Sequence, residues 1–399
     1  MTAPRARGQR ALVAFVQVLA LAVWFSATAI SPALRVEWDL SATAAVWLTA
    51  SVQLGFAAGA VTSSVLNLPD RFPPHRLLAV CAVGAAASTG LLALAGNGLG
   101  TAVPLRALTG MFLAGVYPVG MKLMASWSEP VDRGRAFGVL IGCLTLGSAL
   151  PHLISGLGDL PWRDVMEAAA LVTLTGALVA LVWIRPGPLL QRSHRPEARY
   201  AFAVFGQRAP RLANLGYFGH MWELYAWWTW LPAYLSAARA ESSSTTVSLV
   251  TFASIGLAGV VGSLVGGWAA DRFGRAPAAM GALLTSGLCC VLSPLAYAAS
   301  YPVLLAFLAL WGAAVIADSG VFSTALSETA DQRYVGTALT VQTAVGFSLT
   351  VVTIQLVPVL ADVTGWQFAF LILAPGPALG ALAMFRFGMA ARERERLAA

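Results

Sequence analysis

The sequence predicts an all-α membrane protein with twelve transmembrane helices, arranged as two six-helix bundles that repeat one another. Of its 399 residues, 58% are apolar and 11% are charged, whereas a soluble protein carries about 25% charged residues. Long apolar runs recur along the chain, and each has the roughly 20 residues that a helix needs to cross a bilayer. Short motifs also recur in the two halves in the same order.

The apolar runs form two sets of six, separated by one long polar connector. The first run resembles the apolar core of a signal peptide, but it is too long for one and more spans follow, so we interpret it as an uncleaved first helix. The connector is rich in arginine and contains proline, and it divides the chain into an N-terminal bundle (1–184), a cytoplasmic loop (185–210) and a C-terminal bundle (211–399). The twelve runs are 11–34, 42–66, 76–96, 99–127, 134–158, 162–184, 211–236, 244–270, 276–298, 300–326, 334–360 and 365–388.

Basic residues predict the orientation of these spans. In membrane proteins, short loops rich in Lys and Arg stay on the cytoplasmic side. If the N-terminus is cytoplasmic, twenty of the 25 basic residues lie in inner segments, and only Arg35, Arg163 and Arg239 lie in outer loops. We therefore expect a multi-pass protein of the bacterial cytoplasmic (inner) membrane with both termini inside. The net charge of +7 comes from these loops and not from a nucleic-acid-binding face.

Three motifs of the first half recur in the second half. Asp-Arg-Phe follows the second span at 70–72 and the eighth span at 271–273. Ser-Glu follows the fourth and the tenth span, and a tryptophan opens the sixth and the twelfth. Because each half holds an even number of spans, the two halves share one orientation and are related by an axis along the membrane normal.

The loop motif resembles a known family signature. Residues 267–275 read GWAADRFGR and resemble the GxxxDRxGR signature of the major facilitator superfamily, whereas the first-half copy, LNLPDRFPPHR, lacks both glycines. Arg106 and Gly110 in the fourth span are similar to a second signature of that superfamily. The resemblance implies the major facilitator fold and a functional monomer. It also implies two bundles that rock around a central site lined by the first, fourth, seventh and tenth spans.

The resemblance further implies a conformational latch in the inner loops. At a helix end, an aspartate can accept hydrogen bonds from backbone amides or pair with a basic residue. A simpler role for the arginines, fixing the topology alone, stays open. The predicted latch residues are Gly267, Asp271, Arg272 and Arg275, with Asp70 and Arg71 in the first-half copy.

Ionisable residues inside spans are costly and therefore indicate functional positions. Arg106 and Lys122 lie in the fourth span, and the guanidinium of Arg106 can bind a carboxylate or phosphate as a fork. Lys122 either faces the cavity or extends to the inner surface. The predicted substrate-binding residues are Arg106, Tyr117, Lys122, Trp24 and Trp227.

The seventh span carries the strongest candidates for proton coupling. His220, Glu223 and Trp227 are spaced i, i+3, i+7 and share one helix face. A carboxylate beside an imidazole in a partly dry site is suited to bind and release a proton, so we expect Glu223, His220 and Asp318 to couple transport to protons. The alternatives are an ion pair of Glu223 with Arg106 or Lys122, a purely packing His220, and a pair between Asp318 and Lys122. We expect Trp222, Trp228 and Trp230 to face lipid or its interface.

These features predict a proton-coupled secondary transporter that moves a small anionic or zwitterionic solute by alternating access. The alternative is proton-driven efflux of amphipathic drugs or metabolites, with the aromatic side chains of the seventh span as an adaptable wall. Drug antiporters of the superfamily tend to carry GxxxGPxxGG in the fifth span, and its nitrate carriers an arginine in the second and eighth spans. This chain has neither feature, which weakens both assignments.

Other classes fit the sequence less well. The loops are short, with no acidic cluster or nucleophile–base pair for an enzyme and no GxxxxGK[ST] motif for an ATP-driven pump. The four cysteines lie in apolar runs without metal-ligand spacing. We therefore expect no enzyme activity, no cofactor and no metal. The expected partners are a small-molecule substrate, protons and the lipid bilayer.

Overall fold

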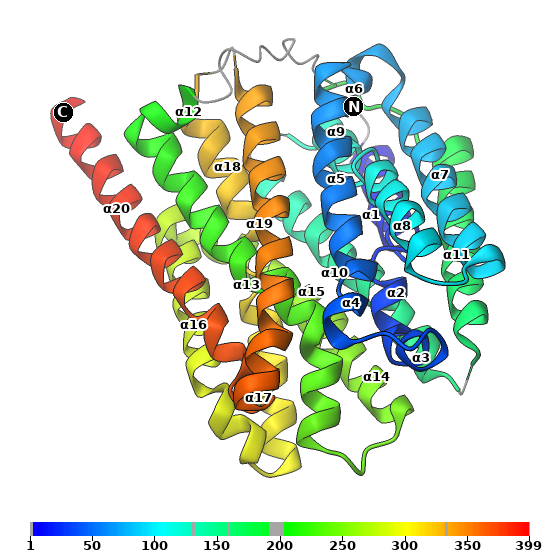
Figure 1. Cartoon of the computed structure of the whole chain (residues 1–399). Helices are drawn as coiled ribbons and strands as arrows, with labels where there is room; N and C mark the ends of the chain where they lie inside the picture. The colour runs from blue at the N-terminus through cyan, green and yellow to red at the C-terminus, as the bar shows by residue number, and fades with distance from the viewer. Residues whose placement is uncertain (1–2, 130–131, 159, 191–202, 332–333, 399) are drawn as a thin grey trace.

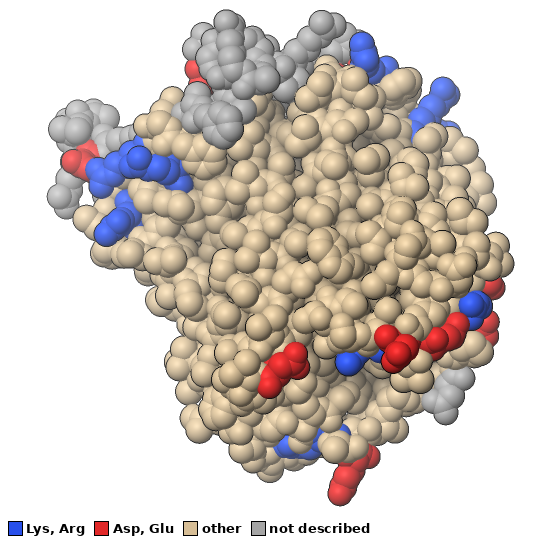
Figure 2. Space-filling view, in the orientation of Figure 1, with Lys and Arg blue, Asp and Glu red and all other residues tan. Residues whose placement is uncertain are grey.

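The computed structural model describes residues 3–129, 132–158, 160–190, 203–331 and 334–398. The predicted connector at 185–210 lies partly outside these residues. Figure 1 shows two groups of long helices side by side, one built from each half of the chain, with both chain ends at the same end of the helices. Figure 2 shows Lys, Arg, Asp and Glu side chains mostly toward the two ends of the molecule, with a broad band of other residues between them.

The N-terminal group holds the first six spans. The short helices α3 (Ser31–Glu37) and α6 (Leu68–Arg71) lie in its loops. Its spans are α1 (Ala3–Ala20) with α2 (Ser26–Ala29), α4 (Ala42–Ala45) with α5 (Trp47–Val65), α7 (Pro74–Ala95), α8 (Leu99–Leu113) with α9 (Tyr117–Ser126), α10 (Arg133–Gly156) and α11 (Trp162–Trp183).

The C-terminal group repeats this pattern after the short helix α12 (Ala203–Gly206). Its eighth span is α14 (Ser244–Phe252), a π-helical turn (Ala253–Leu257) and α15 (Ala258–Phe273). Its other spans are α13 (Arg208–Ala238), α16 (Arg275–Ala298), α17 (Tyr301–Ala314) with α18 (Ser319–Thr329), α19 (Val335–Thr364), and a 3₁₀ turn (Ala369–Leu373) with α20 (Pro375–Ala398).

Ten stretches of the described chain are long and apolar enough to cross a membrane. The two expected spans outside this set are the first and the seventh. The first is interrupted after Ala20, and the seventh, α13, carries the polar residues His220 and Glu223. Together the twelve helical segments match the twelve predicted spans. The predicted all-α fold is therefore confirmed.

Two of the helix interruptions follow the repeat. The fourth span breaks between α8 and α9, and the tenth breaks between α17 and α18, about 200 residues further along the chain. Gly115 and Pro118 account for the first of these breaks, because proline cannot continue the hydrogen-bond ladder of a helix. The repeat therefore includes the backbone geometry as well as the loop motifs.

Two glycines allow the broken spans to pack closely on their neighbours. A Cβ atom on Gly110 of α8 would lie 2.0 Å from the carbonyl oxygen of Val52 in α5. A Cβ atom on Gly312 of α17 would lie 1.9 Å from the carbonyl oxygen of Ser254 in the π-helical turn. Small residues permit this backbone contact between membrane helices. The fourth and tenth spans are thus held against their own bundles in the same way.

The two bundles meet along two pairs of helices. In the first pair α10 packs against α15, and in the second pair α5 packs against α19. The hydroxyl of Thr340 in α19 donates to that of Ser64 in α5 across 2.8 Å. One continuous cluster of buried apolar side chains extends across both bundles. We call the region of this cluster between the two bundles the centre.

Candidate functional site

Arg106 is completely buried and is bound to the interruption of the first span. Its guanidinium donates to the carbonyl oxygens of Trp24 (2.5 Å), Val23 (3.1 Å) and Leu48 (3.3 Å) and to the hydroxyl of Ser26 (3.2 Å). The helix break between α1 and α2 frees the carbonyls of Val23 and Trp24 to accept these bonds. In this structure, Arg106 therefore holds the first span to the fourth, and its donors are occupied by the protein itself.

The ammonium of Lys122 is likewise bound by groups of the protein itself. Its ammonium lies 2.5 Å from the Oδ1 of Asp70 and donates to the carbonyl of Pro69 across 3.2 Å. This contact joins the fourth span to the loop after the second span. The suggested alternative pair between Lys122 and Asp318 is therefore not formed. Both cations predicted to bind substrate are engaged by other parts of the N-terminal bundle.

Glu223 is 1% exposed and lies inside the C-terminal bundle. Its carboxylate accepts from the indole of Trp311 (2.6 Å), the hydroxyl of Ser286 (2.8 Å) and the thiol of Cys290 (3.3 Å). All three donors come from α16 and α17 and are electrically neutral. The suggested ion pair of Glu223 with Arg106 or Lys122 is therefore not formed. A carboxyl group with neutral partners can lose or gain a proton without breaking an ion pair.

His220 and Asp318 form a second buried polar pair, one helical turn from Glu223. The Nδ1 of His220 lies 2.8 Å from the Oδ1 of Asp318, and both side chains are at most 3% exposed. The Nε2 of His220 lies 2.9 Å from the hydroxyl of Ser319. Asp318 and Ser319 sit at the break of the tenth span. The structure thus brings together Glu223, His220 and Asp318, the three residues predicted to couple protons.

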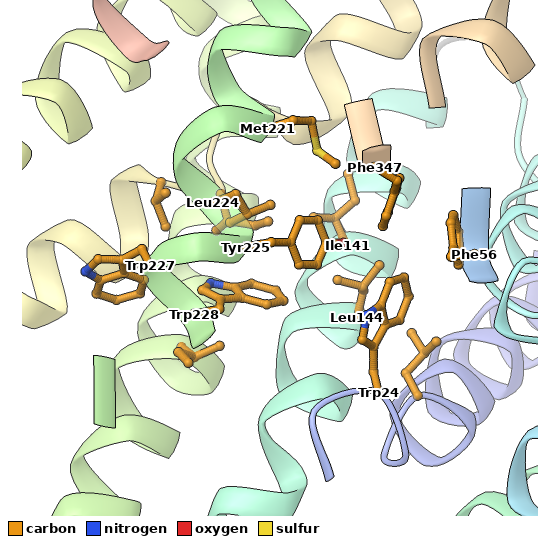
Figure 3. Close-up of a cluster of buried hydrophobic side chains, with 14 of the residues drawn as sticks. Trp24, Phe56, Ile141, Leu144, Met221, Leu224, Tyr225, Trp227, Trp228 and Phe347 are labelled. Carbon is orange, nitrogen blue, oxygen red and sulfur yellow. The ribbon is translucent and has the colours of Figure 1, made fainter. Parts of the chain in front are cut away.

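The predicted helix face of the seventh span is present, but it points into the C-terminal bundle. Trp227 is completely buried, and its ring lies 5.3 Å from the ring of Trp311, the residue that donates to Glu223. Figure 3 shows Trp227 on the side of α13 away from Trp24. Trp227 therefore packs beside the partners of Glu223 inside the C-terminal bundle, whereas Trp24 lies at the centre.

A second face of the same helix carries residues that the sequence analysis missed. Met221, Leu224, Tyr225 and Trp228 are spaced i, i+3, i+4, i+7, and Figure 3 shows them between the bundles. The expectation that Trp228 and Trp230 face lipid is wrong, because they are 1% and 8% exposed. The indole of Trp230 donates to a carbonyl of α19, which explains its burial. The helical spacing alone could have identified this second face.

Aromatic rings of the two bundles meet at the centre. Phe56 of α5 lies 4.2 Å from Phe347 of α19, and Trp24 lies 5.9 Å from both Tyr225 and Phe347. Trp24 also lies 4.9 Å from Phe56 within its own bundle. We call these four residues, Trp24, Phe56, Tyr225 and Phe347, the central ring cluster. Tyr117 lies at the start of α9, beside the break of the fourth span.

The predicted latch residues of the second half lie in the last turns of α15 and at the start of α16. The Oδ1 of Asp271 lies 3.3 Å from Arg275, which also reaches Glu328 at 3.4 Å. A Cβ atom on Gly134, at the start of α10, would come within 2.4 Å of the Asp271 carboxylate. Asp271 of the C-terminal bundle therefore lies against the N-terminal bundle. Helices α15 and α10 also lie close together at Gly267, where a Cβ atom would lie 3.6 Å from the carbonyl oxygen of Gly134.

The remaining latch residues make other contacts. Asp70 pairs with Lys122, as described above. Arg71 is exposed at the end of α6, and the guanidinium of Arg272 lies 5.8 Å from the centre of the Phe273 ring. The aspartates of the two Asp-Arg-Phe copies therefore have different partners, Lys122 for Asp70 and Arg275 for Asp271.

Comparisons with known proteins agree with this architecture. The sequence profile of the Major Facilitator Superfamily matches residues 13–348 and 213–398. The probable sulfoacetate transporter SauU of Cupriavidus necator is 26% identical over 65% of this chain and 64% of its own length. The gallate transporter of Pseudomonas putida is 25% identical over 66% of this chain and 65% of its own length. This chain thus covers less than two thirds of each of these relatives.

A solved structure shows the same fold over the whole chain. The proton:xylose symporter XylE bound to 6-bromo-6-deoxy-D-glucose aligns with a TM-score of 0.74 over 96% of both chains, at 15% identity. The identity is low, so this match concerns the fold alone. The profile match, by contrast, extends over both bundles. On these grounds the chain belongs to the major facilitator superfamily of membrane transporters.

Proposed function

We propose that this protein is a secondary active transporter that couples the movement of a small organic anion to protons. It works by alternating access between its two bundles, residues 1–184 and 211–399, in the bacterial cytoplasmic membrane with both termini inside. The observation that carries the proposal is the environment of Glu223, a buried carboxyl group whose described hydrogen-bond donors are all neutral.

The energetics of Glu223 favour a proton-carrying role. An ionised side chain at the middle of a membrane costs on the order of 3 kcal/mol even when water and headgroups relax around it. A cation beside Glu223 would offset that cost permanently, but none of its described donors is a Lys or Arg. Trp311, Ser286 and Cys290 stabilise the ionised form only in part. Glu223 is therefore suited to exchange a proton when one side of the membrane gains access to it.

His220 and Asp318 extend this site toward the break of the tenth span. The imidazole of His220 and the carboxylate of Asp318 are 2.8 Å apart, and their attraction is stronger when the imidazole carries a proton. A break in a helix is a place where backbone angles can change as the bundles rock. Protonation of this pair would therefore alter the contact that joins α13 to the tenth span.

The substrate is proposed to be a small organic anion. The superfamily relatives reported above are named as a probable sulfoacetate transporter and a gallate transporter. The carboxylates of Glu223 and Asp318 are directed at α16, α17 and His220. An amphipathic cation, the substrate class of the efflux alternative, would therefore find neither carboxylate at the central ring cluster. The rings themselves suit both classes, so the test includes both.

Proteoliposomes provide the test. Purified protein is reconstituted with a pH-sensitive dye inside the vesicles, and radiolabelled carboxylates, sulfonates and amphipathic cations are added with and without an imposed pH gradient. We expect an anion to accumulate only with the gradient and to carry protons that the dye reports. Glu223→Gln should abolish accumulation but keep exchange of labelled for unlabelled anion, because the substrate site stays intact.

Glu241→Gln provides a matched control, since Glu241 is an exposed glutamate in the loop after α13. This variant should transport like the parent. Accumulation of the anion that ignores both the pH gradient and Glu223→Gln would refute proton coupling. Gradient-driven movement of cations but of no anion would replace the proposal with the efflux alternative.

A further inference from the structure

Several buried polar atoms of the N-terminal bundle have no hydrogen-bond partner among the described residues. They include the indole nitrogen of Trp24, both amide atoms of Gln53, the hydroxyl of Ser148 and the Nε2 of His152. Each of these side chains is at most 1% exposed. Leaving such an atom without a partner costs about 1–3 kcal/mol, and native structures contain few of them. Together these atoms indicate a missing polar partner at the centre.

Two of these side chains, Trp24 and Gln53, lie near or within the central ring cluster on the side of the N-terminal bundle. Gln53 shares a face of α5 with Thr49 and Phe56. The Thr49 hydroxyl lies 2.7 Å from that of Thr28, and the ring of Phe56 lies 4.9 Å from that of Trp24. Gln53 therefore lies on the face of α5 between two contacts with the first span, one of which is the contact of Phe56 with the ring of Trp24.

The fifth span adds to this polar edge. Leu144, Ser148 and His152 follow one another at intervals of four residues, so they share a face of α10. Figure 3 shows Leu144 in the same buried cluster as Trp24. The unpartnered hydroxyl of Ser148 thus continues the face that reaches the ring cluster.

Aromatic side chains line the opposite side of the centre, where the indole nitrogen of Trp228 also lacks a hydrogen-bond partner among the described residues. In the C-terminal bundle, the centre of the Tyr225 ring lies 5.5 Å from that of Trp228 and 5.1 Å from that of Phe347. Figure 3 shows the rings of Tyr225 and Phe347 directed at Trp24 and Phe56. In this conformation the rings of one bundle pack on those of the other. Opening of the bundles would expose these ring faces, and a flat ligand would cover them.

The charges that could recognise a ligand are engaged elsewhere. Arg106 is bound to carbonyls of the first and second spans, and Lys122 is bound to Asp70. The centre therefore offers neutral N–H and O–H donors beside aromatic rings, with the donors of Trp24 and Gln53 on the side of the N-terminal bundle. Hydrogen bonds from neutral donors to a charged acceptor contribute about 1.5–3 kcal/mol each, which is enough to orient an anion without trapping it.

We propose that the transported anion is a flat aromatic carboxylate, bound with its ring in the central ring cluster and its carboxylate on the donors of Trp24 and Gln53. The inference rests on the proposed function and specifies its substrate class. The ring replaces the contacts that Trp24 and Phe56 now make with Tyr225 and Phe347. The carboxylate supplies the acceptor that the indole and the amide lack.

The test measures binding separately from transport. The thermal stability of purified protein is followed while benzoate, cyclohexanecarboxylate or benzamide is titrated. These probes share a six-membered ring but differ in planarity or in charge. We expect benzoate to bind at least tenfold more tightly than either of the others. Equal binding of cyclohexanecarboxylate, or no binding of benzoate, would overturn the aromatic assignment.

Variants locate the site. Trp24→Phe keeps a ring but removes the N–H, and Gln53→Leu removes both amide atoms. Each should weaken benzoate binding at least fivefold, whereas Trp268→Phe, at a residue that is 56% exposed on α15, should leave it unchanged. If Gln53→Leu does not fold, Trp24→Phe alone decides the outcome. Unchanged benzoate binding in Trp24→Phe would overturn the assignment of the carboxylate to this edge.

The result is distinguishable from failure of the proposed function. Gradient-driven uptake of an aliphatic acid, with no benzoate binding, would refute the aromatic substrate class and leave proton-coupled anion transport standing. Benzoate binding that is lost in Trp24→Phe, without any proton-coupled movement of an acid, would support the site and refute the transport mechanism.

Discussion

The carboxylate of Asp271 lies against Gly134 at the start of α10, where a Cβ atom would come within 2.4 Å of its Oδ1. The repeat gives Gly336 the matching place at the start of α19, and a Cβ atom there meets nothing within 4 Å. A carboxylate at a helix N-terminus is favourable because the helix dipole is positive there. The carboxylate of the second-half motif therefore contacts the other bundle at this glycine, as the predicted latch requires, whereas the first-half carboxylate pairs with Lys122.

This asymmetry predicts different effects for two otherwise equivalent alanines. Gly134→Ala should displace the Asp271 carboxylate from the helix start and so lose up to about 2 kcal/mol of latch stability. Gly336→Ala should be neutral or slightly stabilising, because alanine favours a helix over glycine. Substrate exchange rates and melting temperatures in detergent check both variants. Equal effects of the two alanines would show that Asp271 does not act as a latch.

Arg106 provides the second prediction. Arg106→Lys keeps the charge, but it leaves at least one of the four acceptors without a donor, because an ammonium has three N–H donors and lacks the planar fork of a guanidinium. Each unsatisfied buried carbonyl costs about 1–3 kcal/mol. We therefore expect a melting temperature lower by several degrees and a large loss of transport. The melting temperature and uptake in proteoliposomes provide the measurements.

Arg163→Lys serves as the comparison, since Arg163 is a partly exposed arginine at the start of α11. Its replacement should change the melting temperature by much less. If Arg106→Lys retained both stability and transport, the contact with the first span would be incidental.

The contacts of Arg106 also show what the sequence could not predict. Hydropathy is a local property, so the number of spans, their limits and the burial of Arg106 followed from the sequence. The partners of Arg106 did not, because residues 20–26 read ALAVWFS and contain neither proline nor glycine to indicate a helix break. The break is stabilised by a donor from another span. A tertiary contact of this kind leaves no local signal.

The third prediction concerns the pair of His220 and Asp318. If they act as one unit, His220→Gln and Asp318→Asn should each abolish accumulation driven by a pH gradient while retaining substrate exchange. The double variant should be no worse than either single one. In stability measurements the pair should show an interaction energy of about 0.5–3 kcal/mol. Effects of the two substitutions that simply add would indicate two independent residues.

The same helix shows the limits of helical periodicity. The i, i+3, i+7 spacing correctly placed His220, Glu223 and Trp227 on one face. It did not reveal that this face packs against α16 and α17, so that Trp227 contacts Trp311 and not the centre. The helical period defines which residues share a face of the helix. The neighbour of each face is set by how the whole bundle packs, and α13 has a second face, with Tyr225 and Trp228, that is equally periodic.

The last prediction uses a group outside the membrane-spanning segments. Glu37, at the end of α3, accepts from the indole of Trp162 across 2.5 Å and from Arg163 across 3.1 Å. The hydrogen bond from Trp162 is the main cause that lowers the pKa of Glu37 below its usual value of 4.5, with Arg163 acting in the same direction. A lowered pKa in the folded state means that the ionised carboxylate stabilises the fold. That contribution is complete above about pH 4.5 and is lost as the pH falls through the folded-state pKa.

We therefore expect Glu37→Gln to lower the melting temperature by a constant amount between pH 6 and pH 8, and the difference from the parent to shrink below about pH 4.5. The effect should be small, because both Glu37 and Arg163 are more than 40% exposed and exposed ion pairs contribute little. Glu241→Gln should show no such pH-dependent difference. Melting temperatures recorded from pH 3.5 to pH 8 provide the measurement. A difference that grew toward acidic pH would mean that the carboxylate destabilises this loop, which is the opposite of what its contacts with Trp162 and Arg163 imply.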